Sequence, residues 1–573
     1  MTLDPAERGV DDRKLFDTVE AAREQFLASR TASPVLHGDR TIYGVMPDWN
    51  PAEIIGRKPK RLASSLYRYL IMDETWARQR AEYGYRDVRP HPLMKSFAGQ
   101  PYVDVRADFN SFIPDRVPDE LAERLVEYYL SRLEANPELH DKIEFDIVLT
   151  CLTFDFESEI EPLLEAGFTR EELEALREGL GEITRGAYGR IEEDMATIEE
   201  LADRYEAVIE ADLPPLVAAQ HLLEDCRRLG TLPFAHLART AFVATALLRS
   251  LERKSVLTSE QVSAFQNSLS TVAREFERDG YRVSTGDMEW DAFVDRYGHL
   301  RPGTYEITSP AYAANPEEYL RPIVDSATDP ETLADPTVVW DEATKREIET
   351  ELEAIGLPPD ADRFIGFLVD AIEGREHSKF VFSRNLSEAL ERIAEFGSHH
   401  GFTREELSNV PIEDLFELTL DHPPADLDSW LEERVREGQE RHAITQSVEL
   451  PPLLFNENDF VVFERPTREP NFVTSEAVTA AVVELDEESV DPDLLDGRLV
   501  MIEAADPGYD WLFGHDIAGL ITMYGGANSH MAVRAAEFEL PAAIGVGEGR
   551  YESLRGAEIV ELDCSARTLR EIE

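Results

Sequence analysis

One stretch near the end of the chain, residues 517–545, constrains the fold most strongly because its pattern changes at fixed points. Residues 517–522 are apolar and predict a strand, and Gly525 and Gly526 break the run where glycine turns at the lowest steric cost. Ser529 is a suitable N-cap for a helix, which Pro541 would end before a second apolar strand. This strand–turn–helix–strand order predicts a small α/β domain.

His530 falls in the first turn of the expected helix. Backbone N–H groups lack intrahelical partners there, and the helix dipole is positive. The position therefore favours a side chain that carries a phosphoryl group. A histidine after a glycine turn is, however, more commonly a capped surface residue, so the surrounding pattern has to decide between the two readings.

The pattern Gly-Gly-x-x-Ser-His-x-Ala, followed by Leu-Pro-Ala-Ala-Ile-Gly, resembles the mobile phosphohistidine domain of phosphoenolpyruvate-utilising enzymes. That group includes phosphoenolpyruvate synthase, pyruvate phosphate dikinase and the rifampicin phosphotransferases. The resemblance implies that His530 is phosphorylated and that Gly525, Gly526 and Ser529 lie beside the phosphoryl group.

The chain departs from the family pattern at two positions. The family usually has arginine six residues after its histidine, where this chain has Ala536, with Arg534 two residues earlier. It also tends to have glycine before the Ile/Leu-Pro pair, where this chain has Glu539. We expect both changes to leave the chemistry of the histidine intact. The surface through which the domain docks can, in contrast, differ from that of the family.

The net charge of the chain, −58, is its most unusual global property. With 573 residues and a hydrophobic fraction of 43%, the chain is expected to be globular with about three domains. The acidic residues are spread along the chain, which favours a halophilic protein in a salt-rich cytoplasm over one with a basic partner. No basic stripe is available for phosphates, which argues against nucleic-acid binding.

The three cysteines, Cys151, Cys226 and Cys564, are far apart and show no Cys-x-x-Cys spacing. This argues against a zinc site or a disulfide framework and fits a reducing cytoplasm. Neither a signal peptide nor a membrane-spanning apolar run is evident. We therefore expect a cytoplasmic protein without a membrane partner.

The predicted fold class is α+β multidomain. The expected units are a helical preamble (1–40), a mostly helical substrate-binding-like domain (41–445), a proline-containing linker (446–470) and a swivelling phosphohistidine domain (471–573). The alternation in residues 102–106 predicts a half-buried strand. One weak apolar helical face is expected in the preamble, from Leu15, Phe16, Val19, Ala22 and Phe26.

Residues 54–66, 297–306 and 375–384 resemble segments of the substrate-binding domain of rifampicin-phosphotransferase-type proteins. Such a domain has to hold an acceptor hydroxyl and neutralise a phosphoryl group, for which the planar fork of arginine is suited. The candidate residues are Arg106, Arg301, Arg375 and Arg384, with His299 as a base for the hydroxyl.

Each of these candidates also has a structural interpretation. An arginine in so acidic a chain is commonly half of a surface ion pair, and His299 could simply brace its loop. The pair His399 and His400 is not expected to bind metal, because adjacent helical side chains point in different directions and no third ligand is near in sequence.

The enzymes of this group load their histidine from ATP with an ATP-grasp domain. This chain has no Gly-x-x-x-x-Gly-Lys-Ser/Thr loop, its opening does not resemble an ATP-grasp domain, and no phosphoenolpyruvate-binding barrel is recognised after the histidine domain. We therefore expect a separate ATP-grasp protein, which binds ATP and Mg²⁺, to load His530, and we assign no cofactor to this chain.

The predicted function is a phosphotransferase component that delivers the phosphoryl group from His530 to a small-molecule hydroxyl or pyruvate-like acceptor. One alternative is that His530 receives its phosphoryl group from another carrier protein. A second alternative is a non-catalytic binding or regulatory protein that retains the swivelling fold.

Overall fold

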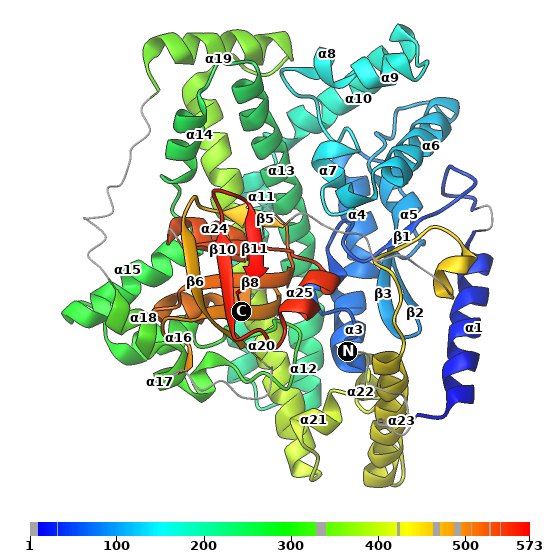
Figure 1. Cartoon of the computed structure of the whole chain (residues 1–573), viewed down its shortest axis with the longest axis vertical. Coiled ribbons are helices and arrows are strands. Elements are labelled where there is room, and N and C mark those ends of the chain that lie inside the picture. Colours follow the sequence, from blue (N-terminus) through cyan, green and yellow to red (C-terminus); the bar gives the residue numbers. More distant parts are fainter. Residues whose placement is uncertain are drawn as a thin grey trace.

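The computed structural model has an extended, mostly helical region followed by a smaller sheet-containing domain at the C-terminus (Figure 1). The predicted α+β multidomain class is confirmed. The structure describes residues 10–30, 33–327, 340–420, 424–461, 470–485, 494–505, 507–526, 529–538 and 540–572.

A small sheet lies near the N-terminal helix α1 (Asp12–Ser29) (Figure 1). Its strand order is β2-β3-β1-β4. The bounds are β1 (Tyr43–Gly44), β2 (Met94–Phe97), β3 (Gln100–Asp104) and β4 (Leu453–Leu454). The predicted strand at 102–106 therefore ends at Asp104, and β3 is buried along its whole length, whereas a half-buried strand was expected.

The apolar face expected on α1 is only partly confirmed. Ala22 and Phe26 are buried, and Phe26 packs edge-on against Tyr43 of the sheet with ring centroids 5.8 Å apart. Phe16, in contrast, is 65% exposed. The helix covers the sheet with its C-terminal half, so the apolar residues nearer its start have less to pack against.

Residues 446–461, expected to be part of the interdomain linker, are packed onto this sheet. The backbone of β4 pairs with β1, and Leu450 and Phe460 are buried. Residues 462–469 of the expected linker lie outside the described residues. The first half of the linker is thus fixed to the N-terminal region.

Helices make up almost all of the region between residues 51 and 447. The first group comprises α2 (Pro51–Ile54), α3 (Arg61–Tyr67), η2 (Arg68–Met72), α4 (Thr75–Tyr83), α5 (Val105–Ser111), α6 (Asp119–Ala135), η3 (Pro137–Leu139), α7 (Ile143–Asp146), α8 (Phe156–Glu159), α9 (Glu161–Glu165), α10 (Arg170–Ala187), α11 (Ile191–Glu210), α12 (Pro215–Asp225), η4 (Cys226–Thr231) and α13 (Leu232–Arg253). The second group comprises α14 (Ser259–Gln266), α15 (Val272–Thr285), α16 (Trp290–Tyr297), η5 (Tyr312–Ala314), α17 (Pro316–Tyr319), α18 (Arg321–Ser326), α19 (Glu342–Ala354), α20 (Ala361–His399), α21 (Arg404–Leu407), α22 (Ile412–Glu417), α23 (Leu427–Ser447) and η6 (Glu457–Phe460).

The long helix α20 forms the spine of this region and packs against α11, α12 and α13. The run Pro215–Arg253 is long and apolar enough to cross a membrane by length and composition, but 78% of its most apolar window is buried inside the fold. It is therefore a core element, as the apolar pattern of α13 requires. The three cysteines are unpaired and buried.

The C-terminal domain is built on a seven-stranded sheet of order β11-β10-β6-β7-β8-β9-β5. Strands β6 to β9 are parallel in this order, and the outer strands are antiparallel. The strands are β5 (Asn471–Val473), β6 (Ala477–Glu484), β7 (Leu499–Ala504), β8 (Gly519–Tyr524), β9 (Ala542–Ile544), β10 (Ile559–Asp563) and β11 (Thr568–Glu571), and the helices are η8 (Pro507–Gly514), α24 (His530–Glu537) and α25 (Glu548–Leu554).

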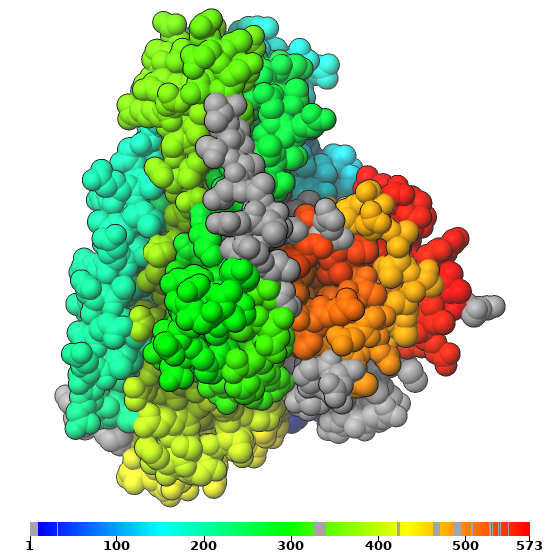
Figure 2. Space-filling model, turned by 90° about the vertical axis from the view of Figure 1, so that its left-hand side faces the viewer, coloured from blue at the N-terminus to red at the C-terminus, as the bar shows by residue number. Residues whose placement is uncertain are grey.

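The C-terminal domain lies against the segment from α15 to α18, as the adjoining orange and green surfaces in Figure 2 show. One buried apolar cluster spans both parts, with residues such as Phe276, Tyr312 and Ile323 on one side and Trp511 and Met531 on the other. The domain is therefore docked through an apolar contact, and this contact determines where its histidine helix lies.

Candidate phosphohistidine site and docking surface

The turn before the histidine helix is shaped by Gly525. Its φ of 141° lies in a region that residues with a side chain rarely adopt. A Cβ at this position would lie 2.7 Å from the Cβ of Ala505 and 2.8 Å from Cγ2 of Ile544. The hydroxyl of Thr522 donates to the carbonyl of Tyr524 at 2.8 Å and accepts from the N–H of Gly545 at 2.9 Å. The turn thus requires glycine, while Thr522 joins the ends of β8 and β9.

The helix α24 begins at His530 and is capped by Ser529, as predicted. The Ser529 hydroxyl accepts a hydrogen bond from the N–H of Ala532, with 3.4 Å between the two atoms. His530 therefore occupies the first position of an eight-residue helix, at its positive end. The side chain of His530 lies outside the described residues, as do Ala527, Asn528 and Glu539.

Arg534, one helical turn after His530, connects this helix to the helical region. Its side chain is 2% exposed, and its Nη1 lies 2.9 Å from Oε1 of Glu277 on α15. Its Nε lies 3.4 Å from Oδ1 of Asp510 on η8. Positions 530 and 534 lie on the same side of the helix because they are four residues apart. The ion pair with Glu277 therefore fixes the orientation of this face of α24.

The segment η8 makes the second connection. The hydroxyl of Tyr312 donates to the carbonyl of Gly508 at 2.7 Å. A Cβ on Gly508 would lie only 2.1 Å from the carbonyl oxygen of Arg301. The ring of Trp511 also packs edge-on against Tyr319. The C-terminal domain therefore rests directly on the loop that carries His299 and Arg301.

The ring of His299 packs edge-on against Phe380 of α20, with centroids 4.6 Å apart. Both ring nitrogens are buried, with the backbone of Phe380 and of Arg296 beside the ring. Burial, followed by the positive charge of Arg384, lowers the pKa of His299 to about 4. The imidazole is therefore neutral at pH 7 and able to accept a proton.

Arg301, a candidate phosphate ligand, is instead a bracing residue in this structure. Its guanidinium donates to the hydroxyl and carbonyl of Ser387, to the carbonyl of Ser309 and to Glu391, at 2.8–3.1 Å for the shortest bond to each group. Burial lowers its pKa to about 10. Its Nε and Nη2 tie the 297–310 loop to α20, and its Nη1 donates within the loop.

The other three candidate arginines have different surroundings. Arg384 lies over the ring of Tyr205 at 3.8 Å and pairs with Glu206 at 2.7 Å. Arg375 lies nine residues earlier on α20, about 14 Å away along the helix axis. Arg106 donates to backbone carbonyls of residues 38 and 29 in the N-terminal region. Of the predicted residues, the structure brings His299, Arg301 and Arg384 together, and it places Arg375 and Arg106 elsewhere.

The residues that dock the domain were not predicted from the sequence. Arg534 stood out only as a displaced arginine, and its spacing from His530 was the available signal. Glu277, Gly508 and Tyr312 carry no local motif. Nothing in the described ranges gathers three metal-ligating side chains, and His400 pairs with Asp428 at 2.9 Å.

Residues 495–567 match the family described as "PEP-utilising enzyme, mobile domain". The curated relatives include the rifampicin phosphotransferase of Bacillus cereus, which is 24% identical over 283 residues, covering 45% of this chain and 31% of the relative. The enzyme of the same name from Bacillus subtilis is 24% identical over 289 residues, covering 46% and 32%.

A third rifampicin phosphotransferase, from Streptomyces sviceus, is 26% identical over 303 residues, covering 47% of this chain and 32% of the relative. The matched part of the chain thus spans about a third of the length of these relatives. The glycine turn, the capped helix and the strands β7, β8 and β9 lie within the matched residues. Residues 495–567 are therefore similar to the mobile domain of PEP-utilising enzymes.

Proposed function

We propose that the chain is a phosphotransferase component in which His530 carries a phosphoryl group to a small-molecule acceptor held by the helical region. The observation that carries this proposal is the docking of the histidine domain on the His299 loop, through Gly508 and Tyr312. A carrier domain has to bring its phosphohistidine to the domain that holds the acceptor. The ion pair between Arg534 and Glu277 supports this geometry.

The proposed chemistry consists of two displacements. In the first, a ring nitrogen of neutral His530 attacks a phosphorus atom of ATP, so that an N–P bond forms and the bond to the leaving phosphate oxygen breaks. In the second, the acceptor oxygen attacks the same phosphorus, an O–P bond forms and the N–P bond breaks. Splitting the transfer in this way allows the donor and acceptor sites to lie far apart.

We propose that His299 accepts the proton of the acceptor hydroxyl during the transfer. A pKa of about 4 makes this imidazole a weak base that is fully available at pH 7. A weak base is sufficient because the transition state of phosphoryl transfer is loose, and an aspartate fills the same role in protein kinases. Arg384 is the nearby candidate for neutralising phosphoryl charge, since Arg301 is occupied by its loop and α20.

The phosphoryl donor in this proposal is ATP bound with Mg²⁺ on a separate ATP-grasp protein. The relatives are named phosphotransferases, which supports a transfer reaction without naming the acceptor for this chain. We place the protein in the cytoplasm, which is consistent with its three unpaired cysteines. The charge of −58 fits a salt-rich cytoplasm.

The test is incubation of the protein with γ- and β-labelled ATP and candidate ATP-grasp proteins, followed by a search for acid-labile protein-bound phosphate. We expect label on the wild type and none on His530→Ala. A matched control is His515→Ala, which changes a histidine of the same domain outside α24. Equal labelling of wild type and His530→Ala would refute the proposal. Labelling only from a phosphorylated carrier protein would show that the phosphoryl donor is that carrier and not ATP.

A further inference from the structure

Two π-helical segments lie side by side in the helical region. The hydroxyl of Thr231 in η4 donates to the carbonyl of Leu70 in η2, with 2.8 Å between the atoms. π-Helical segments are rare and occur frequently at functional sites. Because a π-turn holds more residues than an α-turn, successive side chains are separated by a smaller angle. Arg227 and Arg228, adjacent in η4, therefore both reach the same surface hollow.

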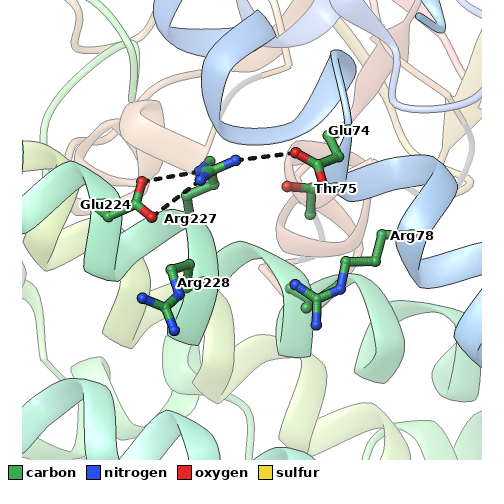
Figure 3. A pocket seen from close by; sticks show the side chains of 7 residues that line it. Glu74, Thr75, Arg78, Glu224, Arg227 and Arg228 are labelled. Carbon is green, nitrogen blue, oxygen red and sulfur yellow. Dashed lines mark hydrogen bonds and ion pairs between the residues drawn. The ribbon is translucent and has the colours of Figure 1, made fainter. Parts of the chain in front are cut away.

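This hollow is a cavity of about 190 Å³ between the start of α4 and η4 (Figure 3). None of its lining residues belongs to the His299 loop or to the histidine domain. The lining residues are Glu74, Thr75, Arg78, Glu224, Arg227, Arg228 and Leu232. Three of these seven residues are arginines, in a chain whose 115 acidic residues outnumber its 57 basic residues.

One of the three arginines is neutralised inside the cavity wall. Arg227 pairs with Glu224 at 3.1 Å and with Glu74 at 3.3 Å. Glu224 is held in turn by the hydroxyl of Tyr69, at 2.7 Å. This chain of ion pairs forms one side of the cavity, so both carboxylates of the lining are already committed to Arg227.

The other two arginines leave their charge facing the cavity. Arg228 makes no ion pair or hydrogen bond in the part of the chain that the structure describes, and its charge acts on the Glu224 carboxylate without direct contact. Arg78 uses only its Nε, which donates to Glu82 at 2.7 Å, so the two terminal nitrogens of its fork are available. Figure 3 shows Arg78 and Arg228 projecting on the same side, away from the Glu74–Arg227–Glu224 chain. The lining thus carries one positive charge in excess.

The start of α4 adds hydrogen-bond donors to this arrangement. Glu74 occupies the N-cap position, but its side chain makes no capping hydrogen bond. The first backbone N–H groups of α4, beginning at Thr75, therefore lack an intrahelical or capping partner. Helix N-termini and guanidinium forks are the two groups that bind oxyanions most effectively in proteins.

We propose that this cavity is a binding site for a small dianionic oxyanion, the phosphate group of a phosphorylated small molecule or inorganic phosphate. Arg228 and the terminal nitrogens of Arg78 bind its oxygens, and the start of α4 supplies further donors. The Arg227 ion-pair chain holds the wall rigid. The site is independent of His530 and of the proposed transfer reaction.

The test is calorimetric titration of the full chain with inorganic phosphate at constant KCl concentration. It is performed on the His530→Ala protein, so that chemistry at that histidine cannot contribute and a failure of the transfer proposal leaves the result intact. We expect one saturable site, with affinity reduced about tenfold or more in Arg228→Gln and in Arg78→Gln. The matched control is Arg170→Gln, which removes an exposed arginine paired with Glu157.

Competition distinguishes the sources of the ligand. Displacement of phosphate by sulfate or by a phosphate monoester, but not by acetate, supports a site for tetrahedral dianions, and tighter binding of the monoester identifies the small-molecule source. The absence of saturable binding, unchanged affinity in Arg228→Gln, or equal competition by acetate would overturn the proposal. Melting temperatures measured without phosphate verify folding, which we expect to be unaffected because Arg228 is exposed.

Discussion

Arg534 of the histidine helix and Glu277 of α15 form an ion pair that joins two regions of the chain, with Nη1 and Oε1 2.9 Å apart. The two residues are far apart in sequence, and the arginine is almost completely buried in the contact. A buried guanidinium that loses its partner is costly. The docked position of the C-terminal domain therefore depends on this pair.

We predict that Glu277→Gln weakens docking by about 1–3 kcal/mol, because the buried Arg534 keeps its charge and loses its ion pair with Glu277. Small-angle scattering would register a larger radius of gyration. Glu275→Gln is the matched control, since it makes the same change on the same helix but its partner is Arg296, within the helical region. The same radius for both variants would contradict the prediction.

We predict that Gly508→Ala separates the C-terminal domain from the His299 loop. The new methyl group would lie 2.1 Å from the carbonyl oxygen of Arg301, which is backbone and cannot move aside like a flexible side chain. Hydrogen exchange should increase in η8 and in residues 298–312. Gly549→Ala, in the same domain, places its methyl group in open space and serves as the control. Unchanged exchange in Gly508→Ala would exclude the contact in solution.

The local structure of the histidine domain could be predicted from the sequence because each step has a local cause. A glycine is needed where φ is 141°, a serine caps the helix it precedes, and a proline follows the helix end. These signals lie within a few residues of the structure that they determine. The strand β8 was also predicted, since a parallel strand buried on both faces appears as an apolar run.

The partners of the arginines could not be predicted in this way. The sequence shows that Arg301 is in a glycine- and proline-rich loop, but its partners Ser387 and Glu391 lie on α20, almost ninety residues later. In the same way, nothing near residue 453 indicates that β4 pairs with β1. Long-range pairing depends on how the helices pack, and local patterns carry no information about it.

We predict that Asp108→Asn stabilises the protein at neutral and alkaline pH. Burial, followed by the negative charge of Asp48, raises the pKa of Asp108 well above its usual value. In the unfolded chain the carboxyl ionises near its ordinary pKa of about 3.9. Between that value and the raised pKa, the folded state binds more protons, so the free energy of unfolding falls as pH rises, by up to about 1.4 kcal/mol per pH unit.

The asparagine variant removes this titration while keeping a polar group of the same shape, so its unfolding free energy should depend less on pH above about 4. Urea denaturation at several pH values measures the difference between the two proteins. The control is Asp146→Asn, which changes an aspartate of α7 that is exposed. Parallel stability curves for wild type and Asp108→Asn would show that Asp108 is ionised in the fold.

We predict that His299 remains neutral down to a pH of about 4, because burial and the charge of Arg384 oppose its protonation. In the unfolded chain the ring protonates near pH 6.5. Stability should therefore decline as pH falls from about 6.5 towards 4, since the unfolded state then binds the extra proton. His299→Gln should remove this decline and, if the ring is the base for the acceptor hydroxyl, slow the transfer about 10²- to 10⁴-fold. A nuclear magnetic resonance titration of the imidazole separates the two effects. A pKa near 6.5 for His299 would contradict its burial. A low pKa together with normal transfer in His299→Gln would leave the ring only a bracing role.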